Sequence, residues 1–129
     1  MLITRNAKTV APPQAKYSHS VEVPANARWL YLAGQVGVRP DGSVPDTFEE
    51  QHEVIWQNTL AILKDAGYGP EHIVRINVYS TQPEGLKWLK PHREKYLHPN
   101  HTPASTWVVV SGLAQPKWVV EMETIAAKA

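Results

Sequence analysis

Apolar residues recur along the chain with two different periods, which predicts helices and strands in alternation. The longest helical pattern begins at Asp46 or Thr47, because Thr47 and Glu50 resemble a capping box. It ends before Gly67, since glycine commonly follows the last helical residue. The buried side of this helix is predicted to carry Phe48, His52, Ile55, Thr59, Ile62, Leu63 and Ala66.

Five shorter segments alternate between polar and apolar residues, as strands do. They cover residues 18–23, 28–34, 72–80, 105–110 and 118–126. A turn at residues 24–26 would join the first two strands into a hairpin. Residues 1–17 are predicted to be irregular, because the Pro12-Pro13 pair forbids a helix there.

The element order ββαβαββ predicts one α+β domain over residues 1–129, with a mixed sheet and two helices on one face. The second helix is expected over residues 83–97, with Pro83 in its first turn and an interruption at Pro91. Two helices cannot cover both faces of the sheet. The uncovered face therefore predicts oligomerisation through the sheet.

The composition argues against several classes of function. The 129 residues carry a net charge of +1, and the basic residues are scattered, so a nucleic-acid partner is not expected. The absence of cysteine removes thiol nucleophiles and cysteine-ligated metals. The six histidines lack metal-ligand spacing, and no metal or other cofactor is expected. Without an apolar leader or membrane span, we expect a soluble, cytoplasmic protein.

The last predicted strand carries two acidic residues, Glu121 and Glu123, on one face, with Cα atoms roughly 6.5–7 Å apart. They are candidates for a general acid and base whose pKa values are separated by unequal burial. Alternatively, one acid pairs with Arg28 or Arg75 and the other lies at a subunit interface. Both interpretations remain open from the residues alone.

Two further positions are candidates for ligand contacts. Gly34 follows a predicted strand without opening a helix, which indicates close approach by a ligand or a neighbouring chain. Trp88, in the second helix, is a candidate for lining a binding pocket.

Several motifs occur together in one order: Leu32-Ala-Gly-Gln35, Pro40-Asp-Gly42, Gln51 with Asn58, Pro103-Ala-Ser-Thr106 and Val120-Glu-Met-Glu-Thr-Ile-Ala126. In this arrangement the chain resembles the Rid family, also called YjgF or endoribonuclease L-PSP, over nearly its whole length. The resemblance implies a chorismate-mutase-like fold. It also implies a homotrimer whose sheets form a central barrel, with small-molecule clefts between subunits.

The resemblance further implies hydrolysis of reactive imines and enamines, such as 2-aminoacrylate, to keto acids and ammonia. Residue by residue, the glutamate that handles the attacking water matches Glu121, the tyrosine near the N-terminus matches Tyr17, and the cleft glycine matches Gly34. The family arginine that grips the substrate carboxylate is replaced by Ser105. A serine hydroxyl cannot supply the bidentate, charged contact of arginine, so a non-standard substrate is expected.

Four functional hypotheses follow from this departure. The first is an imine or enamine hydrolase with Glu121 and Tyr17, and with Ser105 and Gly34 as ligand contacts. The second is a ligand-binding or regulatory trimer without turnover. The third is a ribonuclease or translation inhibitor, a label that some family members carry, against which the balanced charge argues. In the fourth, Arg39, Arg93 or a neighbour's lysine supplies the missing cation from another position.

Overall fold

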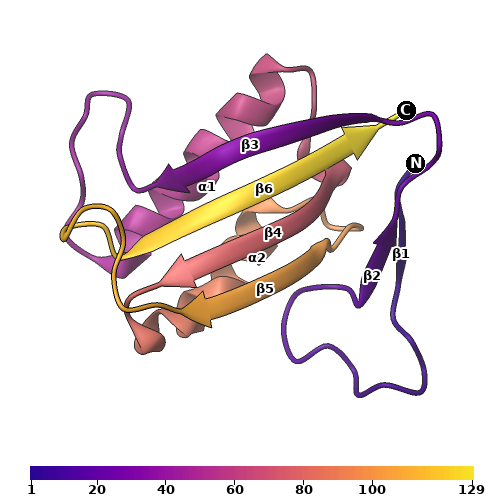
Figure 1. The fold of residues 1–129 in the computed structure, drawn as a ribbon, viewed down its shortest axis with the longest axis horizontal. Helices are drawn as coiled ribbons and strands as arrows, with labels where there is room; N and C mark the ends of the chain where they lie inside the picture. Colours follow the sequence, from indigo (N-terminus) through magenta and orange to yellow (C-terminus); the bar gives the residue numbers. More distant parts are fainter.

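A four-stranded mixed sheet forms the centre of the molecule (Figure 1). The computed structural model describes all residues 1–129. The strand order is β3 (Arg28–Val36), β6 (Val120–Lys128), β4 (Ile73–Ser80) and β5 (Ala104–Val109). The β4–β5 pair is parallel and the other two pairs are antiparallel. The structure thus confirms the predicted mixed α+β sheet, in which the last strand of the chain lies centrally.

Both helices lie behind the sheet in Figure 1, as expected from the sequence. Helix α1 spans Phe48–Asp65, and helix α2 spans Leu89–Tyr96. Short 3₁₀ helices, η1 (Pro70–His72) and η2 (Pro83–Trp88), precede β4 and α2. Thr47 caps α1 by accepting a hydrogen bond from the backbone N–H of Glu50 at 3.2 Å. Neither helix combines the length and apolar character needed to cross a lipid bilayer.

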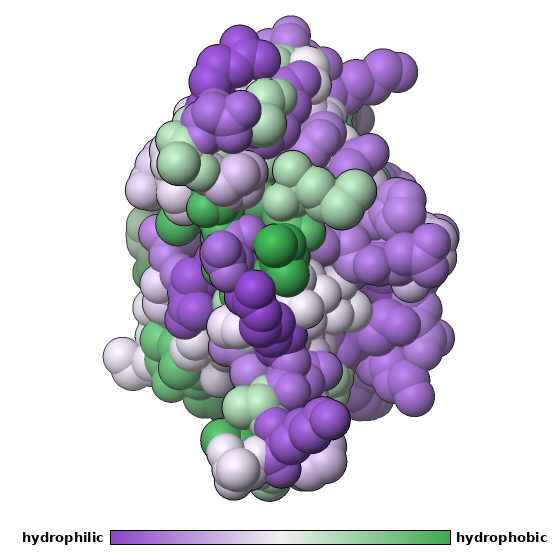
Figure 2. Space-filling view, turned by 90° about the vertical axis from the view of Figure 1, so that its right-hand side faces the viewer, coloured by the Kyte–Doolittle hydropathy of each residue, from purple (hydrophilic) through white to green (hydrophobic).

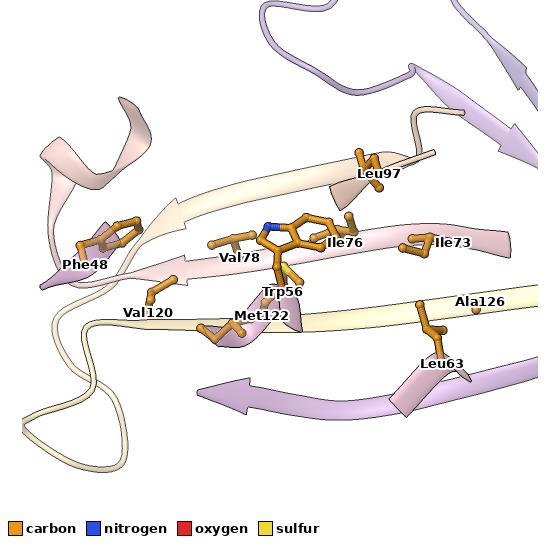
Figure 3. Packing of buried hydrophobic residues seen from close by; sticks show 11 residues of the cluster. Phe48, Trp56, Leu63, Ile73, Ile76, Val78, Leu97, Val120, Met122 and Ala126 are labelled. Atoms are coloured by element: carbon orange, nitrogen blue, oxygen red, sulfur yellow. The ribbon is translucent and has the colours of Figure 1, made fainter. Parts of the chain in front are cut away.

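The core fills the space between the helices and the sheet (Figure 3). Trp56, fully buried on α1, lies between the helix and the apolar residues of β4 and β6. The other members of the cluster are Phe48, Ile55, Leu63, Ile73, Ile76, Val78, Leu97, Val120, Met122 and Ala126. Ile62 and Ala66 were expected to be buried, but both are exposed because α1 turns them toward solvent.

The second helical segment breaks at a different place from the one predicted. The chain changes from the 3₁₀ helix η2 to the α-helix α2 between Trp88 and Leu89, three residues before the expected interruption at Pro91. Pro91 lies in the first turn of α2. A proline there costs little because its missing N–H would have no intrahelical partner anyway. Pro91 therefore does not interrupt α2.

The N-terminal region departs most from the sequence prediction. Residues 1–17 are not wholly irregular, since β1 (Ile3–Arg5) pairs antiparallel with β2 (Ser20–Glu22). The predicted hairpin between residues 18–23 and 28–34 is wrong for this chain, because β2 does not pair with β3. Instead, Ser18 is fixed beside the start of β5, where its N–H donates to the carbonyl of Pro103 at 3.0 Å. The resulting two-stranded ribbon lies beyond the end of the sheet (Figure 1).

The sheet face opposite the helices has no cover within the chain. It carries Trp29, which is 51 % exposed, and Tyr31, which is 71 % exposed, with ring centroids 6.4 Å apart. Val108, on the other edge strand, is also exposed. Large apolar rings on an open sheet face are typical of surfaces that contact another protein.

Candidate functional site

A cavity of about 510 Å³ lies between η2, the start of α2, the 14–17 segment and strand β5. Alternation along β5 directs Ser105 and Trp107 toward the helices, and both line the cavity. The other lining residues are Gln14, Ala15, Tyr17, Leu86, Lys87, Leu89 and Lys90. The cavity therefore combines an apolar wall with two lysines at its rim, and no carboxylate lines it.

Arg93 lies directly behind Ser105. Its guanidinium donates one hydrogen bond to Oγ of Ser105 at 2.8 Å and another to the carbonyl oxygen of Lys16 at 3.2 Å. The side chain is almost fully buried at 1 % exposure, and its Nε has no partner. Burial lowers the pKa of Arg93 to about 10, so it remains protonated at neutral pH. No carboxylate in the chain forms an ion pair with it.

The contact between Arg93 and Ser105 determines how the serine hydroxyl can act. Because the guanidinium can only donate, Oγ of Ser105 accepts this bond, and its own O–H proton is free for another partner. Ser105 lines the cavity, so an anion there could receive that proton as a hydrogen bond. The Ser105 hydroxyl is thus a hydrogen-bond donor that is polarised by the buried positive charge of Arg93.

Tyr17 reaches the cavity because the segment around it is tied to the start of β5. Oγ of Ser18 lies 2.6 Å from the carbonyl of Thr102 and donates to it. The hydroxyl of Tyr17 accepts a bond from the backbone N–H of Gln14 at 3.2 Å, which leaves its O–H proton free. The structure therefore brings two predicted site residues, Tyr17 and Ser105, into one cavity.

Glu121 and Gly34 form a second group. Any Cβ at position 34 would overlap the Glu121 carboxylate, so glycine is required for the present position of that side chain. The β3–β6 register shifts between Leu32 and Gln35. The backbone of Gly34 lies within this irregular stretch, close to the Glu121 side chain. The Glu121 carboxylate makes no ion pair within the chain.

Glu123 is bound differently from Glu121, although both lie on the open sheet face. Its carboxylate accepts a hydrogen bond from the hydroxyl of Tyr79 at 2.5 Å, and this bond raises the pKa of Tyr79. The alternative in which Arg28 or Arg75 pairs with one of the acids is wrong within the chain, since Arg75 binds Asn77 and Thr106 instead. The two acids therefore differ in their partners, and only Glu121 is free.

The predicted residues thus fall into two groups on opposite faces of the sheet. Ser105 faces the helices, where it meets Arg93, whereas Glu121 lies on the uncovered face, because its neighbours Val120 and Met122 are buried against the helices. One chain alone cannot bring these groups around a small ligand. Trp88 belongs to neither group, because it stacks on His92 at 5.7 Å and packs against the core, outside the cavity lining.

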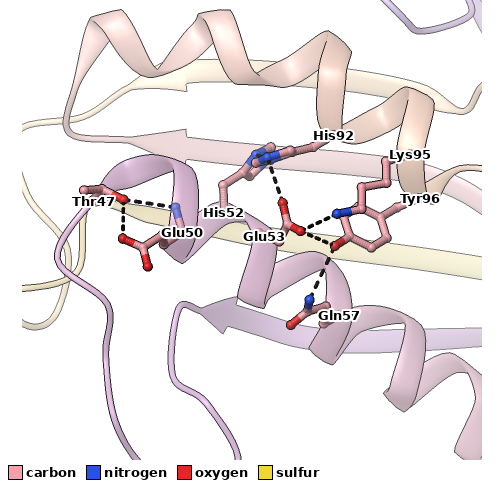
Figure 4. A network of polar contacts seen from close by, with 8 residues as sticks. All are labelled: Thr47, Glu50, His52, Glu53, Gln57, His92, Lys95 and Tyr96. Atoms are coloured by element: carbon pink, nitrogen blue, oxygen red, sulfur yellow. Dashed lines mark hydrogen bonds and ion pairs between the residues drawn. The ribbon is translucent and has the colours of Figure 1, made fainter.

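A polar network joins helices α1 and α2 (Figure 4), and its His52 ring lies 5.6 Å from the ring of Trp107, which lines the cavity. The Nδ1 atoms of His52 and His92 lie 2.6 Å apart, and Nε2 of His92 lies 3.2 Å from a carboxylate oxygen of Glu53. The other Glu53 oxygen binds Lys95 and Tyr96. Burial, followed by the charges of His92 and Arg93, lowers the pKa of His52 to about 3. The sequence placed His52 on the buried side of its helix, as found, but gave neither His52 nor His92 a polar partner.

Sequence reasoning did not identify Trp107, Lys87 or Lys90 as cavity residues. A usable signal exists in the helical spacing of residues 86, 89, 90 and 93, which places them on one side of the η2–α2 segment. No three histidine, aspartate or glutamate side chains converge closely enough to hold a metal ion. The cavity therefore offers cationic and hydroxyl groups for an anion.

Comparison with known proteins defines the family. The family model described as endoribonuclease L-PSP matches residues 8–128. The chain belongs to the endoribonuclease L-PSP (Rid/YjgF) family. A RutC family protein of Aquifex aeolicus is 35 % identical over 118 residues, which cover 90 % of this chain and 91 % of the relative. The mitochondrial protein MMF1 of Saccharomyces cerevisiae is 31 % identical, covering 98 % of this chain and 85 % of its own.

Solved structures confirm the Rid fold. YyfB of Yersinia pestis, described as a Rid family protein of unknown function, superposes with a TM-score of 0.89 at 25 % identity, covering 97 % of both chains. RidA of the Antarctic bacterium Psychrobacter has a TM-score of 0.71 at 27 % identity, covering 96 % of this chain and 98 % of its own. These likenesses support a YjgF-type architecture across nearly the whole Rid chain.

Proposed function

We propose that this Rid protein binds a small organic carboxylate in the Ser105 cavity and hydrolyses an imine or enamine carried by that molecule. The observation that carries the proposal is the buried Arg93 guanidinium, which has no carboxylate partner and lies against the cavity wall. An unpaired buried charge is costly, and a bound anion would offset that cost.

The charges around the cavity support a carboxylate ligand. Arg93 lies behind Ser105, and Lys87 and Lys90 line the rim, while no acidic side chain lines the cavity. The apolar surfaces of Leu86, Leu89 and Trp107 suit the hydrocarbon part of such a molecule. Arg93 would thus supply from helix α2 the positive charge that Ser105 lacks, in agreement with the fourth hypothesis from the sequence.

Glu121 is the proposed base for the attacking water. Its carboxylate would take a proton as water adds to the imine carbon and pass that proton to the nitrogen. It would then move the remaining hydroxyl proton to the nitrogen as well, so that the C–N bond breaks and the nitrogen leaves as ammonia. The remaining carbon keeps the water oxygen as the carbonyl of a keto acid. This step needs a free carboxylate, and Glu121 has no ion-pair partner in the chain, whereas Glu123 is held by Tyr79.

The opposite positions of Ser105 and Glu121 support a site between subunits. A homotrimer packed through the uncovered sheet face would bury the exposed rings of Trp29 and Tyr31. It would also allow the Glu121 group of one copy to face the Ser105 cavity of another. We therefore propose a homotrimer as the active form.

Ammonia release from enzymatically generated imines of small keto acids tests the proposal. Glu121→Gln should abolish turnover, because the amide cannot accept the proton of water. Glu123→Gln is the matched control, two residues away on the same face, and should retain turnover. Unchanged ammonia release in Glu121→Gln, or no release by the wild type above buffer, would refute the catalytic proposal.

A binding protein without turnover is the second candidate. The observation in its favour is that the cationic cavity is complete without Glu121, which lies on the other face of the sheet. A thermal-shift screen with small carboxylates separates the two candidates. Stabilisation by a carboxylate that is equal in the wild type and in Glu121→Gln, without ammonia release, would favour the binding protein.

An RNA-cleaving role, which the description of the matched family contains, has less support in this chain. The net charge is only +1. The two lysines at the cavity line a space of the size of a small molecule and do not form an extended basic surface. Cleavage of RNA that survives Glu121→Gln and repeated purification would favour that role.

A further inference from the structure

We infer that the N-terminal hairpin β1–β2 of one copy pairs with the free edge of β3 in a second copy, and that this exchange completes the ligand site. The site that it completes rests on the function proposed above. The exchange itself does not depend on a ligand, so it is tested separately.

Strand β3 lacks a partner on one side. This nine-residue strand, Arg28–Val36, occupies the edge of the sheet and pairs only with β6. A long edge with free backbone N–H and C=O groups readily accepts another strand. The exposed rings of Trp29 and Tyr31 on the same strand add apolar surface at this edge.

The β1–β2 hairpin also has no strand partner outside itself. Each strand has three residues, none of which is buried, and its pairing is limited to the two strands. Figure 2 views the molecule from the hairpin end, where hydrophilic side chains predominate. A two-stranded hairpin of this kind is marginally stable by itself, whereas a sheet of three or more strands is stable.

The sequence of β2 fits β3. The turn between them contains a hydrogen bond from the N–H of Ala27 to the carbonyl of Pro24 at 3.1 Å. Closure of this turn would set Ser20 opposite Tyr31, with Val21 beside Leu30 on the helix side of the sheet. In this chain that pairing is absent, because Ser18 is tied to the start of β5. An exchanged hairpin reuses the same register between copies, as domain swapping does.

The exchange has a direct consequence for the site. The register that places Ser20 opposite Tyr31 brings the Tyr17 segment to the level of Gly34 in the second copy. Tyr17 already shares a cavity with Ser105 of its own chain, and Gly34 lies against Glu121 of its own chain. The hairpin thus joins Tyr17, Ser105 and Arg93 of one copy to Gly34 and Glu121 of the next.

Disulfide capture tests the exchange cleanly, since the chain contains no cysteine. Ser20 and Tyr31 are both exposed, so S20C and Y31C should leave the fold intact. The two single variants are mixed, unfolded and refolded together, and then oxidised mildly. We expect a covalent heterodimer whose disulfide joins one thiol from each variant, because residues opposite each other on paired strands lie within disulfide reach.

The control mixture combines S20C with V108C, because Val108 is also exposed but lies on the other edge strand. It should give only background cross-linking. If Y31C disturbs folding, a mixture of E22C and W29C tests the same register, because these two positions would lie opposite each other nearer the turn. A double variant S20C/Y31C that closes its disulfide within one chain would overturn the exchange, as would heterodimer yields equal to the control. If the cross-link forms but the protein releases no ammonia, the proposed function is wrong while the hairpin exchange stands.

Discussion

The buried pair formed by His52 and His92 makes the free energy of unfolding fall as the pH is lowered. His52 is fully buried, and its Nδ1 lies 2.6 Å from Nδ1 of His92, so one nitrogen donates and the other accepts. Two protonated rings would direct N–H groups at each other. The neighbouring charges are Glu53, Glu49 and Lys95 near His92, and Arg93 on the same helix as His92. Protonation of His52 is therefore disfavoured in the folded state.

The direction of the effect follows from the pKa values. The pKa of His52 is lowered from 6.5 to about 3 on folding, so the unfolded chain binds the proton first as the pH falls. The stabilising contribution of neutral His52 is complete above the unfolded pKa and is lost progressively below it. Between about pH 7.5 and about pH 5 the loss amounts to about 2 kcal/mol from this residue alone. The pKa of His92 is also lowered, chiefly by burial, which adds a loss in the same direction.

Urea unfolding followed by tryptophan fluorescence measures this loss directly. The wild type should lose at least about 2 kcal/mol of unfolding free energy over that pH range, and His52→Phe should lose about 2 kcal/mol less than the wild type. His98→Gln, at a partly exposed histidine outside the network, is the control and should follow the wild type. An identical pH dependence in the wild type and His52→Phe would refute the reasoning.

Two other substitutions have expected outcomes. Gly34→Ala should sharply reduce ammonia release, because the added Cβ displaces the Glu121 carboxylate, while circular dichroism shows a retained fold; unchanged turnover would contradict the role given to this glycine. Thr47→Ala should lower the urea-unfolding free energy by about 1 kcal/mol by removing the cap of α1, and Thr9→Ala, at an exposed threonine outside helix caps, serves as the comparison. No change in Thr47→Ala would mean that the first turn of α1 is held by packing alone.

Local patterns in the sequence were sufficient for the elements whose ends are set by neighbouring residues. The cap at Thr47 and the glycine at position 67, which has a φ of +82°, determined both ends of α1. Alternation in the last strand placed Glu121 and Glu123 on one face, as the structure confirms, because side-chain direction in a strand follows from period alone. The local signals and the final structure agree at these positions.

Long-range contacts decided the elements that the sequence did not predict. The hairpin at residues 18–34 has good local signals, but the bonds from Ser18 to Thr102 and Pro103 connect residues far apart in the chain. Arg93 could be named as a candidate cation, yet its position behind Ser105 depends on how α2 packs against β5. The register shift next to Gly34 likewise arises from the pairing of β3 with β6. None of these contacts has a short-range signature.

Calorimetric titration with pyruvate, the keto acid formed from 2-aminoacrylate, tests the central claim that Arg93 supports an anion site at Ser105. Arg93 places a buried positive charge behind the Ser105 hydroxyl that would donate to the anion, so Arg93→Gln should bind pyruvate about 10-fold more weakly than the wild type, a loss of about 1.4 kcal/mol. Arg39→Gln, at a half-exposed arginine away from the cavity, should bind as the wild type does. Equal affinity in the wild type and in folded Arg93→Gln would contradict the account.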